Sequence, residues 1–287
     1  MGDTILKLEI GPITLDVDAL MRWLLAKGKN DPMALVALRF LQLFKSHGVA
    51  ISQIPRLIPQ LTLENLRSTE SLLPVLSCDV LESAATLFGV RRVWLEGVDD
   101  RIYPPSTCYS DPQGFFNDVA SLKMPANGFG LRALTSSKSL DCRNVRKQPI
   151  ALVLVEKIQD LGSEEIVRYR PYGDSWDWSY QTSRIQLKAM VRVMCQIYQK
   201  PVPLYQINVN NLQAIIDGKH VPHAALQGCL LTNPSLEDFS LSNKESAVSR
   251  EAFELQKVVD YIRKHDLDTF ARVSGQGQRQ IVRFCKS

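Results

Sequence analysis

Aromatic and arginine side chains are concentrated in one short segment of this chain, YRPYGDSWDWSY at positions 169–180. The segment holds five of the 22 aromatic residues. Arginine attracts anions and packs on rings, so these residue types can form a pocket for a flat or anionic ligand. They are equally typical of a dimer interface, or of tryptophans that fill the core beneath a helix. We favour packing over a ligand site, with one set of residues as candidates for either role: Arg168, Arg170, Tyr172, Trp176, Trp178 and Arg184.

Other side chains that carry catalysis or bind metals lack the spacing that such chemistry requires. His220 and His223 are separated by Pro222, which opposes a helix, and no third ligand lies nearby in sequence. Asp174 and Asp177 are the nearest approach to an acid–base pair. The motifs G-x-S-x-G, G-x-x-x-x-G-K-[ST], H-E-x-x-H and G-x-G-x-x-G do not occur. We therefore expect no enzyme, no cofactor and no metal.

The elements that must position these residues begin with a helical region in the first hundred residues. Residues 4–15 are expected to form an extended arm or short hairpin. Helical spacing of apolar residues and capping residues predict helices over about 16–27, 31–46, 79–88 and 90–97. Asn30 or Asp31 can cap the second helix, Pro32 suits its first turn, and Gly89 can end the third in the left-handed conformation.

The sequence DVLESAATLFGVRRVWLEG, at 79–97, resembles the closing half of the Cro/Xre-type (lambda-repressor-like) helix-turn-helix domain. The resemblance covers about residues 34–98. It implies an all-α DNA-binding domain, which we place at residues 1–103 together with the N-terminal arm.

The resemblance also implies roles for individual residues. In its register, 51–58 corresponds to the second helix, Pro59 and Gln60 to the turn, and 61–68 to the recognition helix that enters the major groove. Asn, Gln and Arg pair well with base edges, and the side chains implied to read DNA are Gln60, Thr62, Asn65, Arg67 and Ser68. The side chains implied to bind phosphates are Lys45, Arg56, Arg91 and Arg92.

The rest of the chain is expected to form an α+β domain at 112–232 and a C-terminal region at 233–287. A stretch rich in Pro, Ser, Asp and Gly, 99–114, is interpreted as the linker that precedes the α+β domain. Within that domain we expect strands over 130–136, 150–156 and 165–170, and helices over 115–122, 183–199 and 209–216. In the C-terminal region a helix over 249–263 precedes a basic tail, 269–287, which either contacts phosphates or is disordered.

Two functions suit this multi-domain α and α+β organisation. The first is a dimeric, sequence-specific transcriptional regulator that binds double-stranded DNA, with an α+β domain that dimerises and senses a small-molecule effector. The second is a protein–protein interaction or adaptor protein whose degenerate helix-turn-helix does not bind DNA. Residues 1–100 contain ten Lys and Arg against twelve Asp and Glu, and Pro55 and Pro59 depart from the family pattern, which favours the second.

Surface charge separates these two functions. Arg56, Arg67, Arg91 and Arg92 on one face without acids would favour DNA, whereas Glu64, Glu70 and Glu82 on that face would favour a protein partner. A more remote third function is a nucleic-acid enzyme with an acidic site at Glu156, Glu164 or Glu165.

Composition and hydropathy set the expected location. The chain has 287 residues, of which 45% are hydrophobic and 22% charged, as is normal for a globular protein of about two domains. It contains no run of eighteen apolar residues, and its N-terminus lacks a basic-then-apolar signal. We therefore expect a cytoplasmic protein with no membrane contact.

Overall fold

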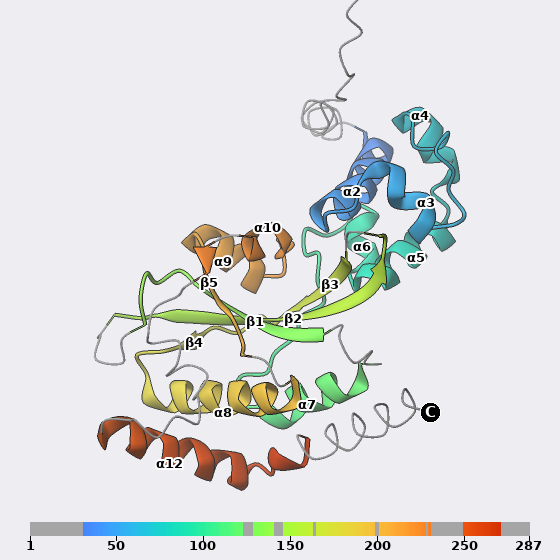
Figure 1. Cartoon of the computed structure of the whole chain (residues 1–287). Helices are drawn as coiled ribbons and strands as arrows, with labels where there is room; N and C mark the ends of the chain where they lie inside the picture. Colours follow the sequence, from blue (N-terminus) through green and yellow to red (C-terminus); the bar gives the residue numbers. More distant parts are fainter. Residues whose placement is uncertain are drawn as a thin grey trace, which may run out of the picture.

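A computed structural model of the chain (Figure 1) describes residues 31–122, 129–140, 146–162, 165–198, 201–227, 229–230 and 249–270. In this part of the chain, a helical unit formed by residues 31–103 is followed by a mixed β-sheet with helices on both faces. The predicted α+β content is therefore confirmed. The expected arm at 4–15, the expected helix at 16–27 and the tail beyond residue 270 lie outside the described residues.

Short helices build the helical unit: α2 (Pro32–Ser46), η1 (Ile51–Gln53), α3 (Ile54–Leu57), α4 (Thr69–Leu72), η2 (Leu73–Val75), α5 (Cys78–Phe88) and α6 (Arg92–Leu95). Asp31 caps α2, because its side chain accepts hydrogen bonds from the backbone N–H groups of Met33 and Ala34. Gly89 ends α5 with a φ of +66°, which suits a residue without a Cβ. Both boundaries agree with the sequence expectation.

The expected recognition helix at 61–68 is wrong. These residues form turns, and a helix begins only at Thr69. The Asn65 side chain accepts hydrogen bonds from the backbone N–H and the hydroxyl of Thr62, both at 2.8 Å. Such local bonds from Asn and Thr side chains compete with helical hydrogen bonding, so this segment closes into turns instead. The arrangement of a complete helix-turn-helix is therefore not formed here.

The α+β part contains α7 (Pro112–Ser121), β1 (Phe129–Thr135), β2 (Pro149–Asp160), β3 (Glu165–Pro171), β4 (Trp176–Asp177), α8 (Gln181–Tyr198), β5 (Leu204–Gln206), α9 (Val209–Ile216), α10 (His223–Leu226), β6 (Cys229–Leu230) and α12 (Ser249–Lys264). The longer elements agree with the sequence expectation to within a few residues. The expectation missed β4, β5, β6 and α10, because two to four residues are too few to show a hydrophobic period.

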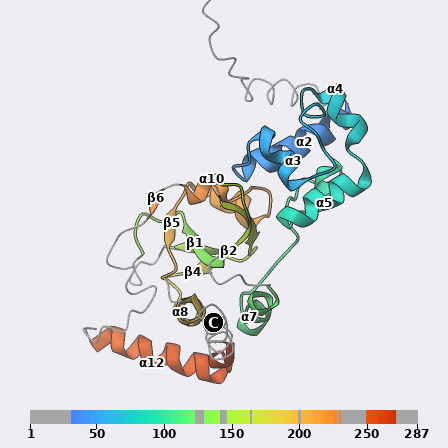
Figure 2. The ribbon, with the colours of Figure 1, turned by 45° about the vertical axis from the view of Figure 1, so that its right-hand side comes forward.

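The sheet has the order β3-β2-β1-β5-β6, and β4 pairs with β2. Neighbours β1, β2 and β3 are antiparallel, whereas β1 and β5 are parallel. One face is covered by α7 and α8, with α12 packed outside α8, and the other by α9 and α10 (Figures 1 and 2). Residues 150–154 of β2 alternate between the two faces and are all buried, which explains their continuous apolar run.

The helical unit shares its core with the sheet. Phe44 of α2 and Phe88 of α5 belong to the same buried cluster as Val153 of β2 and Tyr169 of β3. The segment 99–114 is not the free linker that its composition suggested. The backbone N–H groups of Ile102 and Tyr103 donate to the Gly218 carbonyl oxygen at 2.7 and 3.1 Å, and the Tyr103 side chain is buried. Composition alone misread this segment because its buried residues, Ile102, Tyr103 and Cys108, lie among polar residues and the exposed Pro104 and Pro105.

Candidate functional site: an arginine cavity at the junction

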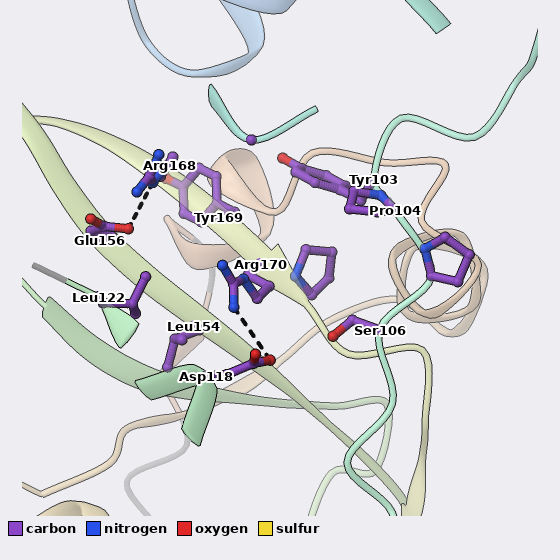
Figure 3. Close-up of a pocket in the computed structure, with 13 residues that line it drawn as sticks. Tyr103, Pro104, Ser106, Asp118, Leu122, Leu154, Glu156, Arg168, Tyr169 and Arg170 are labelled. Carbon is purple, nitrogen blue, oxygen red and sulfur yellow. Dashed lines mark hydrogen bonds and ion pairs between the residues drawn. The ribbon is translucent and has the colours of Figure 1, made fainter. Parts of the chain in front are cut away.

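A cavity of about 390 Å³ lies where the helical unit meets the sheet, and we call it the junction cavity (Figure 3). Residues from four parts of the chain line it: Gly89 at the end of α5, the segment Tyr103–Ser106, Asp118 and Leu122 in and after α7, and Leu154, Glu156 and Arg168–Pro171 on β2 and β3. The size is within the usual range for a small-molecule site.

One wall of the junction cavity carries charge. Glu156 lies opposite Arg168 in the antiparallel register of β2 and β3, so both side chains project from the same face of the sheet. Arg168 Nε donates to Glu156 Oε2 at 2.7 Å, and Arg170, two residues further along β3, forms an ion pair with Asp118, with 3.3 Å between Nη1 and Oδ2 (Figure 3). The wall therefore presents two guanidinium groups, each with one carboxylate partner.

The two ion pairs differ in exposure. The Glu156 side chain is 13% exposed, whereas Asp118 and Arg170 are 42% and 39% exposed. Solvent screens the Arg170–Asp118 pair, and exposed pairs of this kind contribute little to stability. Arg170 is consequently the cation that a ligand can reach at the lower cost.

The opposite wall is apolar and held in place. Pro104, Pro105 and the Tyr103 ring form it. His47 Nδ1 donates to the Leu43 carbonyl oxygen at 2.7 Å, which leaves Nε2 to accept from the Tyr103 hydroxyl at 3.4 Å. Burial raises the pKa of Tyr103 well above its ordinary value, so the phenol stays neutral. The wall therefore offers a ligand apolar surface and no charge.

Hydrogen bonds from the segment after β3 fix this wall. The Gly173 backbone N–H donates to the Ser106 carbonyl oxygen at 2.7 Å, and a Cβ at Gly173 would approach that oxygen to 3.3 Å. The Asp174 carboxylate accepts from the Thr107 hydroxyl and from the backbone N–H groups of Cys108 and Tyr109. Asp174 is thus a structural acceptor that holds residues 106–109 against the sheet.

The structure separates the predicted aromatic and arginine cluster into three places. Arg168 and Arg170 line the junction cavity. Tyr172, Trp176 and Trp178 are buried in the core between the sheet and α8, in line with the packing that we favoured. Arg184 is buried as well, with its guanidinium bonded to Glu254 of α12.

Most of the predicted DNA-contacting residues bond to local or acidic partners. Among the side chains meant to read bases, Thr62 and Asn65 bond to each other, Arg67 pairs with Glu64 at 3.0 Å, and Ser68 caps α4. Gln60 lines an open groove of about 500 Å³ whose rim carries the acids Asp79 and Glu82. Acidic residues therefore surround the positions where base contacts were expected.

The predicted phosphate contacts are engaged as well. Arg92 pairs with Glu96 at 2.7 Å and with Glu82 at 3.5 Å. Arg91 pairs with Asp99. Arg56 Nη1 donates to the Leu161 carbonyl oxygen at 3.3 Å, which directs it toward the β2–β3 turn. Lys45 lies in the last turn of α2 and is exposed.

Sequence reasoning missed most of the cavity lining, including Tyr103 and Asp118. Tyr103 was interpreted as part of the domain boundary, and no local signal connects Asp118 on a helix with Arg170 on a strand. Glu156 was noted only as a carboxylate of a remote enzymatic option. Glu156 lies opposite Arg168 because of the register between β2 and β3. The alternation of apolar and polar residues along these two strands could have indicated that register.

Comparisons of the chain with protein-family models, with curated proteins and with solved structures found no match. Within the described residues, no group of three or more His, Cys, Asp or Glu side chains is arranged to hold a metal ion. In the same part of the chain, no single helix has the length and apolarity to cross a membrane, although two bent helix pairs pass by length and composition. The resemblance to the Cro/Xre family stays an expectation from sequence.

Proposed function

We propose that the chain is a ligand-responsive interaction protein that binds a small anionic molecule with a flat, apolar body in the junction cavity. The observation that carries this proposal is that Arg168 and Arg170 face one cavity whose opposite wall is apolar. Guanidinium groups suit oxyanions because their planar forks donate two parallel hydrogen bonds. Since the lining comes from the helical unit and from the sheet, a bound ligand contacts both.

A thermal-shift experiment on the full chain tests ligand binding. The probes are adenosine 5′-monophosphate (AMP), adenosine and inorganic phosphate, which supply the ring and the anion together or separately. AMP is expected to raise Tm more than adenosine or phosphate, because it supplies the ring and the anion together. A ligand at about 100 times its Kd stabilises the folded state by about 2.7 kcal/mol.

Matched charge variants locate the effect. Arg170→Gln is expected to lose the shift, whereas Arg67→Gln is expected to keep it, because Arg67 is exposed, lies outside the cavity lining and pairs with Glu64 in a local turn. Equal shifts in the wild type and both variants, or no shift with AMP, would overturn the proposal.

The helical unit is the second part of the proposal: we infer that it contacts a protein partner and not DNA. Support comes from the ion pairs on the arginines, including Arg67 with Glu64, Arg91 with Asp99 and Arg92 with Glu96. Residues 31–103 contain seven Lys and Arg against eight Asp and Glu. Such a surface gains little from counterion release, which supplies most of the affinity for a DNA backbone.

Fluorescence anisotropy with labelled duplex DNA across salt concentrations tests this inference. We expect no steep salt dependence and no effect of Arg67→Gln or Arg92→Gln. A steep salt slope that these two substitutions reduce would restore the transcriptional regulator as the better description.

A further inference from the structure

We propose that the anionic group of the ligand is a phosphate monoester and that it takes the place of Asp118 on Arg170, so that ligand binding breaks the polar contact between α7 and β3. This inference rests on the proposed function, because it specifies the ligand and the consequence of its binding at the same cavity.

The hydrogen bonds of Asp118 show why this carboxylate can be replaced. Asp118 Oδ2 forms an ion pair with Arg170 Nη1 and accepts a hydrogen bond from the Tyr172 hydroxyl, both at 3.3 Å. Charge-assisted bonds of full strength are about 2.7–2.9 Å long. The Arg168–Glu156 pair reaches 2.7 Å with a largely buried carboxylate. The Arg168–Glu156 pair can therefore orient Arg168 while the Arg170–Asp118 pair opens.

The charge of a phosphate favours the exchange. A carboxylate ligand would replace one carboxylate by another, with one negative charge in each case, and would gain little. A phosphate monoester carries about −1.5 to −2 charges at pH 7 and has three acceptor oxygens. It can accept from Arg170 and from Arg168 at once, so it competes better than Asp118 does.

The contacts of α7 give the exchange a structural consequence. Asp118 joins α7 to β3 across the cavity, whereas the opposite side of α7 contacts the C-terminal region. There Gln113 Nε2 donates to the His265 carbonyl oxygen at 3.0 Å, and the Phe116 ring stacks on Phe270 with centroids 5.2 Å apart. Loss of the Asp118 contacts therefore frees the polar side of α7 from β3, whereas Phe115, Phe116 and Val119 keep the helix in the core and its contacts with the C-terminal region persist.

Calorimetric titration of the full chain with AMP, adenosine and adenosine 5′-carboxylic acid tests the inference. Asp118→Asn removes the competing charge, so we expect its Kd for AMP to fall by about fivefold or more, with no change for adenosine. Asp260→Asn is the matched control and is expected to leave Kd unchanged, because Asp260 is an exposed acid on α12 that accepts a local bond from Gln256. The carboxylic acid analogue is expected to bind the wild type more weakly than AMP.

An unchanged or weaker affinity of Asp118→Asn for AMP would overturn the exchange, as would equal binding of the phosphate and the carboxylate. Amide hydrogen exchange of α7 provides the second readout, and it is expected to become faster when AMP binds to the wild type. Unchanged protection of α7 in the complex would overturn the loss of this polar contact. A failure of the proposed function has a different signature, namely that AMP does not bind the wild type or that Arg170→Gln binds it equally well.

Discussion

At the scale of single residues, the buried imidazole of His47 makes the stability of the fold depend on pH. Burial lowers the pKa of His47 to about 4, an effect to which the nearby His223 adds and which the hydrogen bond to Leu43 opposes. Burial lowers the pKa of His223 as well. Their rings lie among neutral partners, since the hydroxyls of Tyr103 and Tyr169 bond to them.

The sign of the pH effect follows from the lowered pKa. Between pH 6.5 and pH 4 the unfolded chain binds a proton at His47 that the folded chain does not, so the free energy of unfolding falls as pH falls. The loss attributable to His47 is about 3 kcal/mol. Urea unfolding at several pH values is the measurement, with His47→Gln expected to flatten the dependence and exposed His220→Gln expected to leave it unchanged. A full pH dependence in His47→Gln would contradict this assignment.

The same scale shows what residue types alone could predict about the site. Arg168 and Arg170 were identified from their aromatic surroundings, and both line the junction cavity. Tyr172, Trp176 and Trp178 have the same composition signal but are buried. Composition reports which side chains are available for a pocket, whereas the alternation of β3 and the helices packed on it decide which of them face one.

At the scale of elements, α12 is attached to α8 through one carboxylate and two buried cations. Glu254 accepts from Lys188 Nζ at 2.8 Å and from Arg184 Nε at 3.1 Å, and the Lys188 side chain is fully buried. Burial alone would raise the pKa of Glu254, but the hydrogen bonds and charges of Arg184 and Lys188 lower it to about 2. This contribution to stability is therefore present above pH 4.5 and is lost as pH falls toward 2.

Glu254→Gln is expected to destabilise the fold by about 3–5 kcal/mol, because it leaves two buried cations without their anion. Urea unfolding at neutral pH is the measurement. Asp260→Asn on the exposed side of the same helix is expected to change stability by less than about 0.5 kcal/mol. Equal stability of the wild type and Glu254→Gln would show that this cluster does not hold α12 in place.

The elements also show where sequence reasoning is reliable. Boundaries set by local chemistry were predicted, such as the Asp31 cap of α2 and the Gly89 end of α5. The segment 61–68 was assigned a helix through a family resemblance, and its Thr62–Asn65 hydrogen bonds close turns instead. Local side-chain bonding can override a register transferred from another family.

At the scale of the whole molecule, one continuous core joins the helical unit to the sheet. Phe88 and Trp94 of the helical unit lie in the same cluster as Val153 and Tyr169. We therefore expect the two parts to unfold in a single transition. Helical circular dichroism and near-ultraviolet tryptophan signals should give the same urea midpoint. Two separated midpoints would show that residues 31–103 unfold independently.

Sequence alone could predict most of the long elements because each has its own periodic pattern. It could not predict the shared core or the junction cavity, since both depend on contacts between residues that are far apart in the chain. Asp118 and Arg170, for example, are brought together only when α7 packs against β3.

Isothermal titration calorimetry of the full chain with AMP is the most direct test that the junction cavity is a ligand site. We expect one saturable site in the wild type, an affinity at least about tenfold weaker in Arg170→Gln, and wild-type affinity in Arg67→Gln. The same affinity in all three proteins, or no binding to the wild type, would contradict this expectation.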